Sequence, residues 1–418
     1  MNRMPERSEF GSEVFSRALE VSARVQEIRE DIHRHPELRF EEHRTSGLCA
    51  DELEHSGIRV SRGVGGTGVV GILSMGEPAD GPVVGFRAEM DALAMDDLCG
   101  KPYASLTPGA AHLCGHDGHV AALLGAASVL ASLRARLPGT VKFMFEPSEE
   151  ATPPGEACGA EAMIADGALG PPTPQAIFGS HFYPDWLAGS IAVRPGVVFT
   201  GNDMVRLRIK GRESHSAVPH EGIDAVYVAG QVIVATQGLV SHLDIEEAVS
   251  VHWSTVHGGR MPNLIAEDVV LEGSFRYSDQ SLRQQMKQRV EDLVKGICGA
   301  FGASYEIDFG VRPMPAVINS EIETGIVIQA AAEGLGRKNV INMGQPRLAA
   351  DTMFHWLHER PGVFYMVGTA GEDPSTRYPS HHQKFDIDPA AFPAAVTTII
   401  MTAFRFLEQA QNRTGGRH

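Results

Sequence analysis

Cysteine is scarce in this sequence, and its spacing does not predict disulfide bonds. The chain of 418 residues has five cysteines scattered over its length, namely Cys49, Cys99, Cys114, Cys158 and Cys298. Small secreted proteins instead carry dense cysteine frameworks that pair evenly. We therefore expect free thiols and a reducing compartment, for which the cytoplasm is the default.

Long hydrophobic runs and an excess of positive charge are also missing. The stretch MNRMPERSEFGSEVF at the N-terminus is charged throughout, and no later segment approaches the roughly 18 uninterrupted apolar residues of a membrane helix. The formal net charge of -16 argues against a nucleic-acid partner, because phosphate backbones require clustered Lys and Arg. With 43% hydrophobic residues, the chain can bury a full core spread over about two or three domains.

The apolar pattern predicts an α/β fold. Helical spacing runs through residues 12–57 and breaks at the Pro-containing turn HRHPEL, which predicts two helices there. From residue 58 onward, short β-type runs alternate with Gly-rich turns, and AALLGAASVLASLRARL then predicts a buried helix before the strand TVKFMFEP. Strand, loop, helix and strand in this order indicate a mostly parallel sheet flanked by helices.

The region from about 200 to 312 has a different order of elements. Its apolar pattern predicts β-α-β-β-α-β, the order of a ferredoxin-like α+β module. The chain returns to α/β character afterwards, so we predict an inserted domain at 199–312 within a first domain formed by 1–198 and 313–418.

The stretch HLCGHDGH, residues 112–119, concentrates three histidines and a cysteine at the predicted mouth of the sheet. Cys114 and His116 flank one glycine, so in an extended backbone both side chains point to the same side and can share a metal ion. Two alternatives stay open: a Cys114 thiol nucleophile with His116 as its base, or a turn in which Asp117 and the glycines cap a buried helix.

Further candidate ligands follow other predicted strands. TVKFMF ends in EPSEE, where a turn would let both Glu149 and Glu150 face the cleft, one as a metal ligand and the other as general base. A solvated acidic turn is the alternative. His181 follows another β-type run, and His381 lies in YPSHHQKF, so distant segments would assemble one polar centre at the ends of the strands.

Together these motifs resemble the M20 metallopeptidases, specifically the amidohydrolase subfamily with aminoacylases, hippurate hydrolases and auxin-conjugate hydrolases. The resemblance covers nearly the whole chain, in the ordered motifs HRHPEL, FEEHRTS, GGTGVVGIL, FRAEMDAL, CGHDGHVAALLGAA, GTVKFMFEPSEE, GAEAMIADGAL, GSHFYP, HSAVPHEGIDAV, PNLIAEDVVLEGSFR and HHQKFDID. It implies an enzyme that hydrolyses amide bonds with two divalent ions, Zn²⁺ or Mn²⁺ first and Co²⁺ or Ni²⁺ as further candidates. The ligands that it implies are Cys114, His116, Glu150, His181 and His381.

The same resemblance assigns further roles. It implies that Glu149 is the general base and that Asp91 supports the metal ligands. It implies that the inserted domain is a lid that forms a homodimer and brings the catalytic His215 and the substrate-binding Asn263 to the substrate. Arg276 would clamp a substrate carboxylate, although a strand-face residue paired with a sheet neighbour is an equal alternative.

The chain also departs from the family pattern. Glu89 and Ala94 stand in FRAEMDALA where RADMDALP is usual, ATPPGEAC replaces a Gly-rich loop after the paired glutamates, AADTMF replaces a SEDF-like motif, and HHQ replaces HHP. We therefore predict hydrolysis of an N-acyl amino acid or similar small amide with unusual specificity. Deamination of an aromatic amine and dipeptide or carboxypeptidase-type cleavage are the alternatives, and a non-catalytic binding protein is disfavoured because Glu149 and the ligands are all present.

Overall fold

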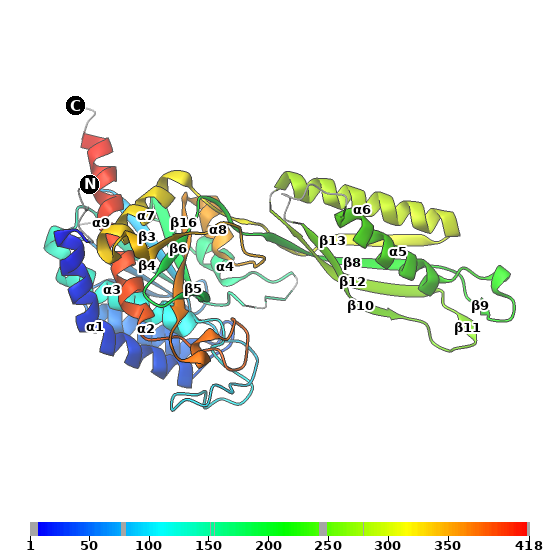
Figure 1. Cartoon of the computed structure of the whole chain (residues 1–418), viewed down its shortest axis with the longest axis horizontal. Helices are drawn as coiled ribbons and strands as arrows, with labels where there is room; N and C mark the ends of the chain where they lie inside the picture. The colour runs from blue at the N-terminus through cyan, green and yellow to red at the C-terminus, as the bar shows by residue number, and fades with distance from the viewer. Residues whose placement is uncertain are drawn as a thin grey trace.

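The computed structural model describes residues 7–76, 81–150, 152–153, 155–241, 249–278 and 280–415. Within these ranges the chain forms a broad main lobe and a narrow second lobe that projects from one side of it (Figure 1). The first and last helices both belong to the main lobe, and the second lobe is built from the middle of the sequence.

The main lobe is organised around an eight-stranded sheet with the order β1-β2-β4-β3-β5-β16-β6-β15 in the described part of the chain. The central pairs β4–β3, β3–β5 and β5–β16 are parallel, as is β6–β15, which confirms the predicted mostly parallel sheet. Its strands are β1 (Arg59–Val64), β2 (Gly68–Leu73), β3 (Val83–Glu89), β4 (Thr140–Glu146), β5 (Ala176–Leu187), β6 (Ile191–Val193), β15 (Val340–Asn342) and β16 (Gly362–Ala370).

Helices cover both faces of this sheet. On one face α1, α3, α7 and α9 pack against one another, and on the other lie α4 and α8 (Figure 1). Every residue of β3 and β4 is buried, which agrees with their position at the centre of a sheet covered on both faces. The main-lobe helices are α1 (Glu9–Arg34), α2 (His43–His55), α3 (His116–Ser132), α4 (Gly159–Ala165), α7 (Glu321–Leu335), α8 (Met353–Glu359) and α9 (Ala391–Gly415).

Helix α9 is long and apolar enough over Ala391–Arg413, with a mean hydropathy of 1.3, to cross a membrane by length and composition. However, 89% of its most apolar window is buried inside the fold, against α1, α3 and α7. A core helix of this kind needs no membrane to explain its composition.

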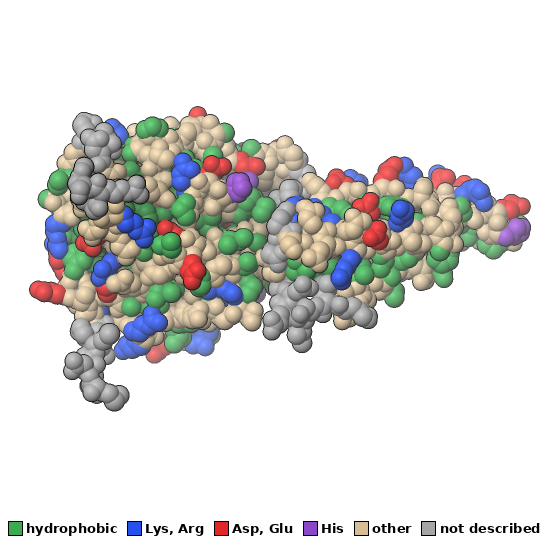
Figure 2. Space-filling model, turned by 90° about the horizontal axis from the view of Figure 1, so that it is seen from above, with side chains coloured by type: hydrophobic (Ala, Val, Ile, Leu, Met, Phe, Trp, Pro, Cys, Tyr) green, Lys and Arg blue, Asp and Glu red, His purple; other side chains and the backbone are tan. Residues whose placement is uncertain are grey.

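The second lobe has the predicted order of elements. Its strands form a four-stranded antiparallel sheet in the order β10-β12-β8-β13, and two helices cover one face of it (Figure 1). Acidic and basic side chains are interspersed on the face of this lobe seen in Figure 2. Its elements are β8 (Gly201–Lys210), α5 (Ala225–Val240), β10 (Ser250–Gly258), β12 (Asp268–Tyr277), α6 (Gln280–Phe301) and β13 (Ser304–Met314).

Short elements complete the fold. A ribbon of β9 (Ser214–His215) and β11 (Leu264–Ile265) lies at the far end of the second lobe (Figure 1). Strands β7 (Gly196–Phe199) and β14 (Val317–Asn319) pair with each other. Single 3-10 turns lie at Arg134–Arg136, Pro219–Glu221, Arg337–Asn339 and Pro374–Arg377.

Candidate metal centre

A left-handed glycine places Cys114 beside His116. Gly115 has φ 94° and is the N-cap of α3, whose first residue is His116. The extended backbone predicted across this glycine is therefore wrong: the chain turns there, and the two side chains converge because a helix begins. Side chains other than hydrogen are disfavoured at this φ, and a Cβ at position 115 would lie 3.4 Å from Cβ of Phe182.

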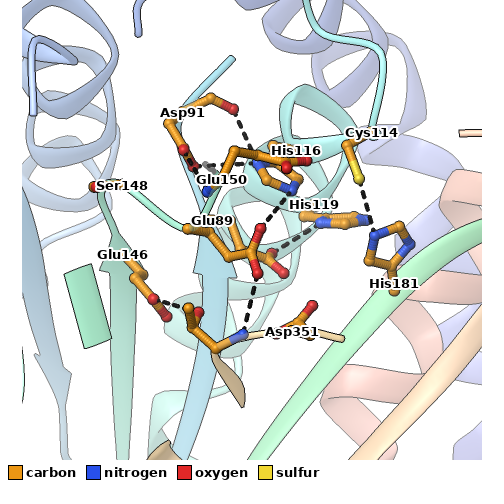
Figure 3. A network of polar contacts seen from close by, with 12 residues as sticks. Glu89, Asp91, Cys114, His116, His119, Glu146, Ser148, Glu150, His181 and Asp351 are labelled. Carbon is orange, nitrogen blue, oxygen red and sulfur yellow. Dashed lines mark hydrogen bonds and ion pairs between the residues drawn. The ribbon is translucent and has the colours of Figure 1, made fainter. Parts of the chain in front are cut away.

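Two histidines of the centre each use one ring nitrogen in a hydrogen bond to the main chain, which leaves the other nitrogen for a metal ion. Nδ1 of His116 donates to the main-chain oxygen of Asp91 at 2.9 Å, and Nδ1 of His181 donates to that of Phe182 at 3.0 Å. Because a carbonyl only accepts, the proton of each ring is on Nδ1 and the lone pair is on Nε2. Nε2 of His181 faces Sγ of Cys114 at 3.3 Å (Figure 3).

A strained turn after β4 presents the paired glutamates. Strand β4 ends at Glu146, and Ser148 has φ 48°, a conformation that a buried non-glycine residue keeps only when its surroundings hold it. Here the N–H of Ser148 donates to a carboxylate oxygen of Glu42 at 2.8 Å. The residue Glu149 is 7% exposed and the side chain of Glu150 is 12% exposed, so a solvated acidic turn does not describe them.

Glu150 and His381 form a pair at the open side of the centre. Nε2 of His381 donates to Oε1 of Glu150 at 3.0 Å, and the main-chain N–H of Glu150 donates to Oδ2 of Asp91 at 2.8 Å. Burial alone would raise the pKa of Glu150, but the hydrogen bond and charge of His381 hold it below its ordinary value. Asp91 thus contacts both His116 and Glu150.

Glu149 lies beside the ligands with one oxygen anchored. Its Oε1 accepts the main-chain N–H of Thr352 at 3.0 Å, and its Oε2 lies 4.0 Å from Nε2 of His116. Burial, together with the charges of Asp351 and Glu150, raises the pKa of Glu149 well above its ordinary value. A carboxylate with a raised pKa next to an electrophilic centre is suited to receive a proton.

These side chains fit a divalent metal ion. Ligand atoms of Cys114, His116 and His181 lie within 4.8 Å of one another, as do those of Cys114, Glu150 and His381. Nε2 of His116 is buried and has no hydrogen-bond partner among the described residues, which is costly unless a cation takes its lone pair. Thiolate, imidazole and carboxylate are ligands of Zn²⁺ and related borderline ions.

A buried ionic network behind the centre was not predicted from the sequence. Nε of Arg87 donates to Glu146 at 2.6 Å, and the same guanidinium pairs with Glu89 and lies 3.2 Å from Asp351. The hydroxyl of Thr352 accepts from Arg87 and donates to Glu146, each at 2.7 Å. One sequence signal could have pointed to this network. Glu89 and the AADTMF segment both depart from the family pattern, and the structure places them together although they are far apart in sequence.

His119 is part of this support and is not free to bind a metal. Its Nε2 accepts the N–H of Phe182 at 2.9 Å, so its proton is on Nδ1 and donates to Glu89 at 2.8 Å (Figure 3). His112 is buried as well, and burial lowers its pKa to about 3. Of the three histidines in HLCGHDGH, His116 is the one at the centre.

Comparisons with known proteins identify the family. The profile described as Peptidase family M20/M25/M40 matches residues 85–404, which is more than half of the chain. The chain belongs to this family. It is thus a metal-dependent hydrolase that acts on carbon–nitrogen bonds, as the sequence predicted.

Similar M20 proteins match over nearly their full length. An N-acetyl-L-cysteine deacetylase of Bacillus subtilis is 34% identical over 91% of this chain and 88% of its own length. Thermostable carboxypeptidase 2 of Saccharolobus solfataricus is 31% identical over 93% of this chain and 96% of its own length. The crystal structure of the YXEP protein of Bacillus subtilis, described as a dinuclear metal binding peptidase from the M20 family, is 30% identical with a TM-score of 0.79, over 93% of this chain and 99% of that one.

Within a single copy of this chain, His215 and Asn263 do not lie near the candidate metal ligands. His215 lies on β9, and Asn263 precedes β11, so both belong to the far end of the second lobe, away from the start of α3 in the main lobe, where Cys114 lies (Figure 1). Both residues are exposed. Within one chain, neither residue lies at the candidate metal centre, and their roles stay predictions.

Arg276 lies on β12 at the end nearer the main lobe. Its NH1 donates to the main-chain oxygen of Leu348 at 3.1 Å, and no carboxylate partner occurs among the residues that the structure describes. Burial lowers its pKa. The alternative that Arg276 pairs with a sheet neighbour is therefore not what the structure shows.

Proposed function

We propose that the chain hydrolyses the amide bond of an N-acyl amino acid or similar small amide with water activated by two divalent metal ions. The observation that carries the proposal is the convergence of ligand atoms from four separate segments, with Glu149 beside them. The ligands are Cys114, His116, Glu150, His181 and His381. The similar Bacillus subtilis protein described as dinuclear metal binding supports a pair of ions.

The position of Glu149 supports a proton path through its carboxylate. Bound metal ions would polarise the substrate carbonyl and lower the pKa of water. With Oε1 held by Thr352, the other oxygen of Glu149 faces His116 and takes the proton of the attacking water. Glu149 then passes this proton to the leaving amine as the carbon–nitrogen bond breaks, which yields a carboxylate and a free amine.

We further propose that the substrate carries a free carboxylate on its amine side. Arg276 is a half-buried guanidinium without an ion pair in the described structure, and a carboxylate is the group that a guanidinium fork binds best. Deacetylation of an N-acetyl amino acid and removal of a C-terminal residue both cleave an amide next to such a carboxylate, in keeping with the names of the two similar enzymes.

A cavity of about 510 Å³ beside the centre can receive a substrate side chain. It is lined by Tyr183, Trp186 and Arg347, among others, and the ring of Tyr183 lies 4.8 Å from that of His181. The Arg347 guanidinium covers the Tyr183 ring at 4.5 Å and forms an ion pair with Asp185. Because this charge is already paired, the cavity favours an aromatic or apolar group over a second anion.

We propose that the active form is a homodimer in which segment 199–312 acts as lid and dimerisation domain. His215 and Asn263 would then complete the site of a neighbouring copy. Exposed apolar side chains on α5 and β10 support association through this lobe: Val226 (48% exposed), Tyr227 (52%), Val234 (72%) and Val256 (52%). We propose Zn²⁺ or Mn²⁺ as the ions and the cytoplasm as the location.

The test is a substrate panel with enzyme that has been stripped by a strong chelator and reconstituted with Mn²⁺ or Zn²⁺. Activity should vanish on chelation and return with metal. N-acetyl and N-benzoyl amino acids and dipeptides should be cleaved with a kcat/KM about 10-fold or more above that of the same compounds with a carboxamide in place of the carboxylate.

Two results would overturn the proposal. Activity that survives chelation but is abolished by thiol alkylation would instead indicate a Cys114 nucleophile, for which Nε2 of His181 is the base within reach. Release of ammonia from an aromatic amine, without amide cleavage, would indicate the deaminase alternative.

A further inference from the structure

Outside the candidate metal centre, α4 and α8 bring together another group of metal-ligating side chains. Cys158 is the N-cap of α4, Glu161 lies in its first turn, and His355 lies on α8. One ligand atom of each lies within 4.8 Å of the others. All three line a cavity of about 530 Å³ that also reaches Arg283 and Gly310 of the second lobe.

Helix capping explains only part of this arrangement. The N–H of Cys158 donates to Oε2 of Glu161 at 3.1 Å, and the Cys158 side chain accepts the N–H of Glu161, which together form a capping box. Serine or threonine usually fills the first position, and cysteine is not among the preferred N-caps. Capping also leaves out His355, whose Nε2 faces Oε1 of Glu161 at 3.9 Å, too far for a hydrogen bond.

We propose that Cys158, Glu161 and His355 bind an additional divalent ion of the borderline class, with Zn²⁺ as the first choice. Thiolate, carboxylate and imidazole provide three ligands of a tetrahedral site, and a water molecule in the adjoining cavity can provide the fourth. A cation between His355 and Glu161 would also bind the two side-chain atoms that lie too far apart to form a hydrogen bond. None of the three residues belongs to the proposed catalytic pair of ions.

The ion at this place would be accessible from solvent and would join two helices near the active site. The side chains of Glu161 and His355 are 48% and 23% exposed, and Cys158 is buried. Among the proposed catalytic ligands, Cys114, His116 and His181 are buried and the side chain of His381 is 51% exposed. Helix α8 begins after Thr352, whose N–H holds Glu149. Occupancy would therefore tie α4 to the helix that positions the proposed general base.

The experiment starts from holoenzyme with its tightly bound metals, from which loosely bound ions have been removed by desalting. Zn²⁺ is then titrated, and protein-bound zinc is measured by mass spectrometry; a parallel titration with Cd²⁺ follows the thiolate-to-metal absorbance band. The central variant is Cys158→Ser, because serine keeps the capping box but removes the soft thiolate. His355→Ala leaves the cap intact, and His358→Ala on the same helix is the matched control.

The proposal predicts about one more bound ion per chain in the wild type and in His358→Ala than in Cys158→Ser and His355→Ala. The Cd²⁺ band and a zinc-dependent rise in the melting temperature should be lost in the same two variants. Equal metal content in all four proteins would overturn the proposal, as would an extra ion that persists in Cys158→Ser. Because the result is a difference between proteins that share the catalytic centre, it stands apart from the test of the proposed function.

Discussion

Thr352 joins the buried ionic network to the proposed general base. Its hydroxyl bridges Arg87 and Glu146, while its N–H holds Glu149. Thr352→Val keeps the shape but removes the hydroxyl that bonds NH2 of Arg87 and Oε1 of Glu146, while the direct Arg87–Glu146 pair remains. We therefore expect the free energy of unfolding to fall by about 1–3 kcal/mol and kcat to fall more than KM changes. Thr352→Ser keeps the hydroxyl and should retain most of the stability and most of the kcat. Denaturant unfolding and steady-state kinetics of the two variants check this, and normal kcat in Thr352→Val would remove its positioning role.

His33 should make the stability depend on pH. Burial and the charge of Arg29 would lower its pKa, but hydrogen bonds to Asp117 (2.7 Å) and Asp97 (3.2 Å) outweigh them and raise the pKa to about 10. A raised folded-state pKa gives stability that is complete below the unfolded pKa of about 6.5 and is lost as the pH rises through about 10.

The pH dependence is tested with His33→Gln, which keeps a polar side chain that does not titrate. The difference in unfolding free energy between wild type and variant should be largest near pH 6 and should shrink steadily toward about pH 10. The rings of Tyr103 and His112 also lie near His33. A difference that stays constant over this range would show that a neighbouring group carries the pH dependence instead.

Single residues were predictable from the sequence where ligand types cluster. Cys114 and His116 could be selected because three histidines and a cysteine cluster in HLCGHDGH, and the paired glutamates because carboxylates at the end of an inner strand are costly unless they are used. Arg87 and Thr352 could not be selected, since an arginine within a strand and a threonine in a loop have many ordinary roles, and only the fold shows that they meet.

At the level of elements, the start of α3 depends on Gly115. An alanine there must adopt φ 94°, and its Cβ would lie 3.4 Å from Phe182. We expect Gly115→Ala to cost about 1–2 kcal/mol of stability and to weaken metal binding, because Cys114 and His116 would move apart.

Gly109→Ala provides the matched control for this substitution. Gly109 has φ 76° and nothing within 4 Å of its added Cβ. It should therefore show the backbone strain without the loss of metal. Metal content and melting temperature of both variants decide between these effects, and equal metal content would contradict the role of the Gly115 turn.

Element types could be predicted more reliably than local backbone geometry. The helices within 12–57 and the order of elements in 200–312 follow from apolar periodicity, which the core imposes on sequence. The conformation of Gly115 did not follow, because a glycine is compatible with both the extended and the left-handed backbone.

At the scale of the whole molecule, the account requires two copies of the chain. Val234 on α5 is 72% exposed in one chain, so Val234→Glu should leave the fold intact but disfavour association through the second lobe. The resulting monomer should be inactive because His215 cannot reach its own metal centre. Light scattering and activity at matched concentration check this, with Leu19→Glu, 52% exposed on α1, as control. A fully active monomer would remove the claim.

The sequence could not show this separation. Motif order places His215 between the catalytic segments, but only the fold reveals that β9 lies at the far end of a long lobe (Figure 1). Packing between distant segments decides which parts of the molecule lie close together. The apolar periodicity of a single segment carries no information about this packing or about association of chains.

The central claim is that Glu149 moves the proton of a metal-activated water. The most direct measurement compares metal content and turnover of Glu149→Gln with wild type, and with Glu156→Gln as a surface control. Glutamine can still accept the N–H of Thr352, so the account predicts about two bound ions per chain and a kcat lowered by roughly 10²- to 10⁴-fold. Turnover close to that of the wild type with full metal content would contradict it.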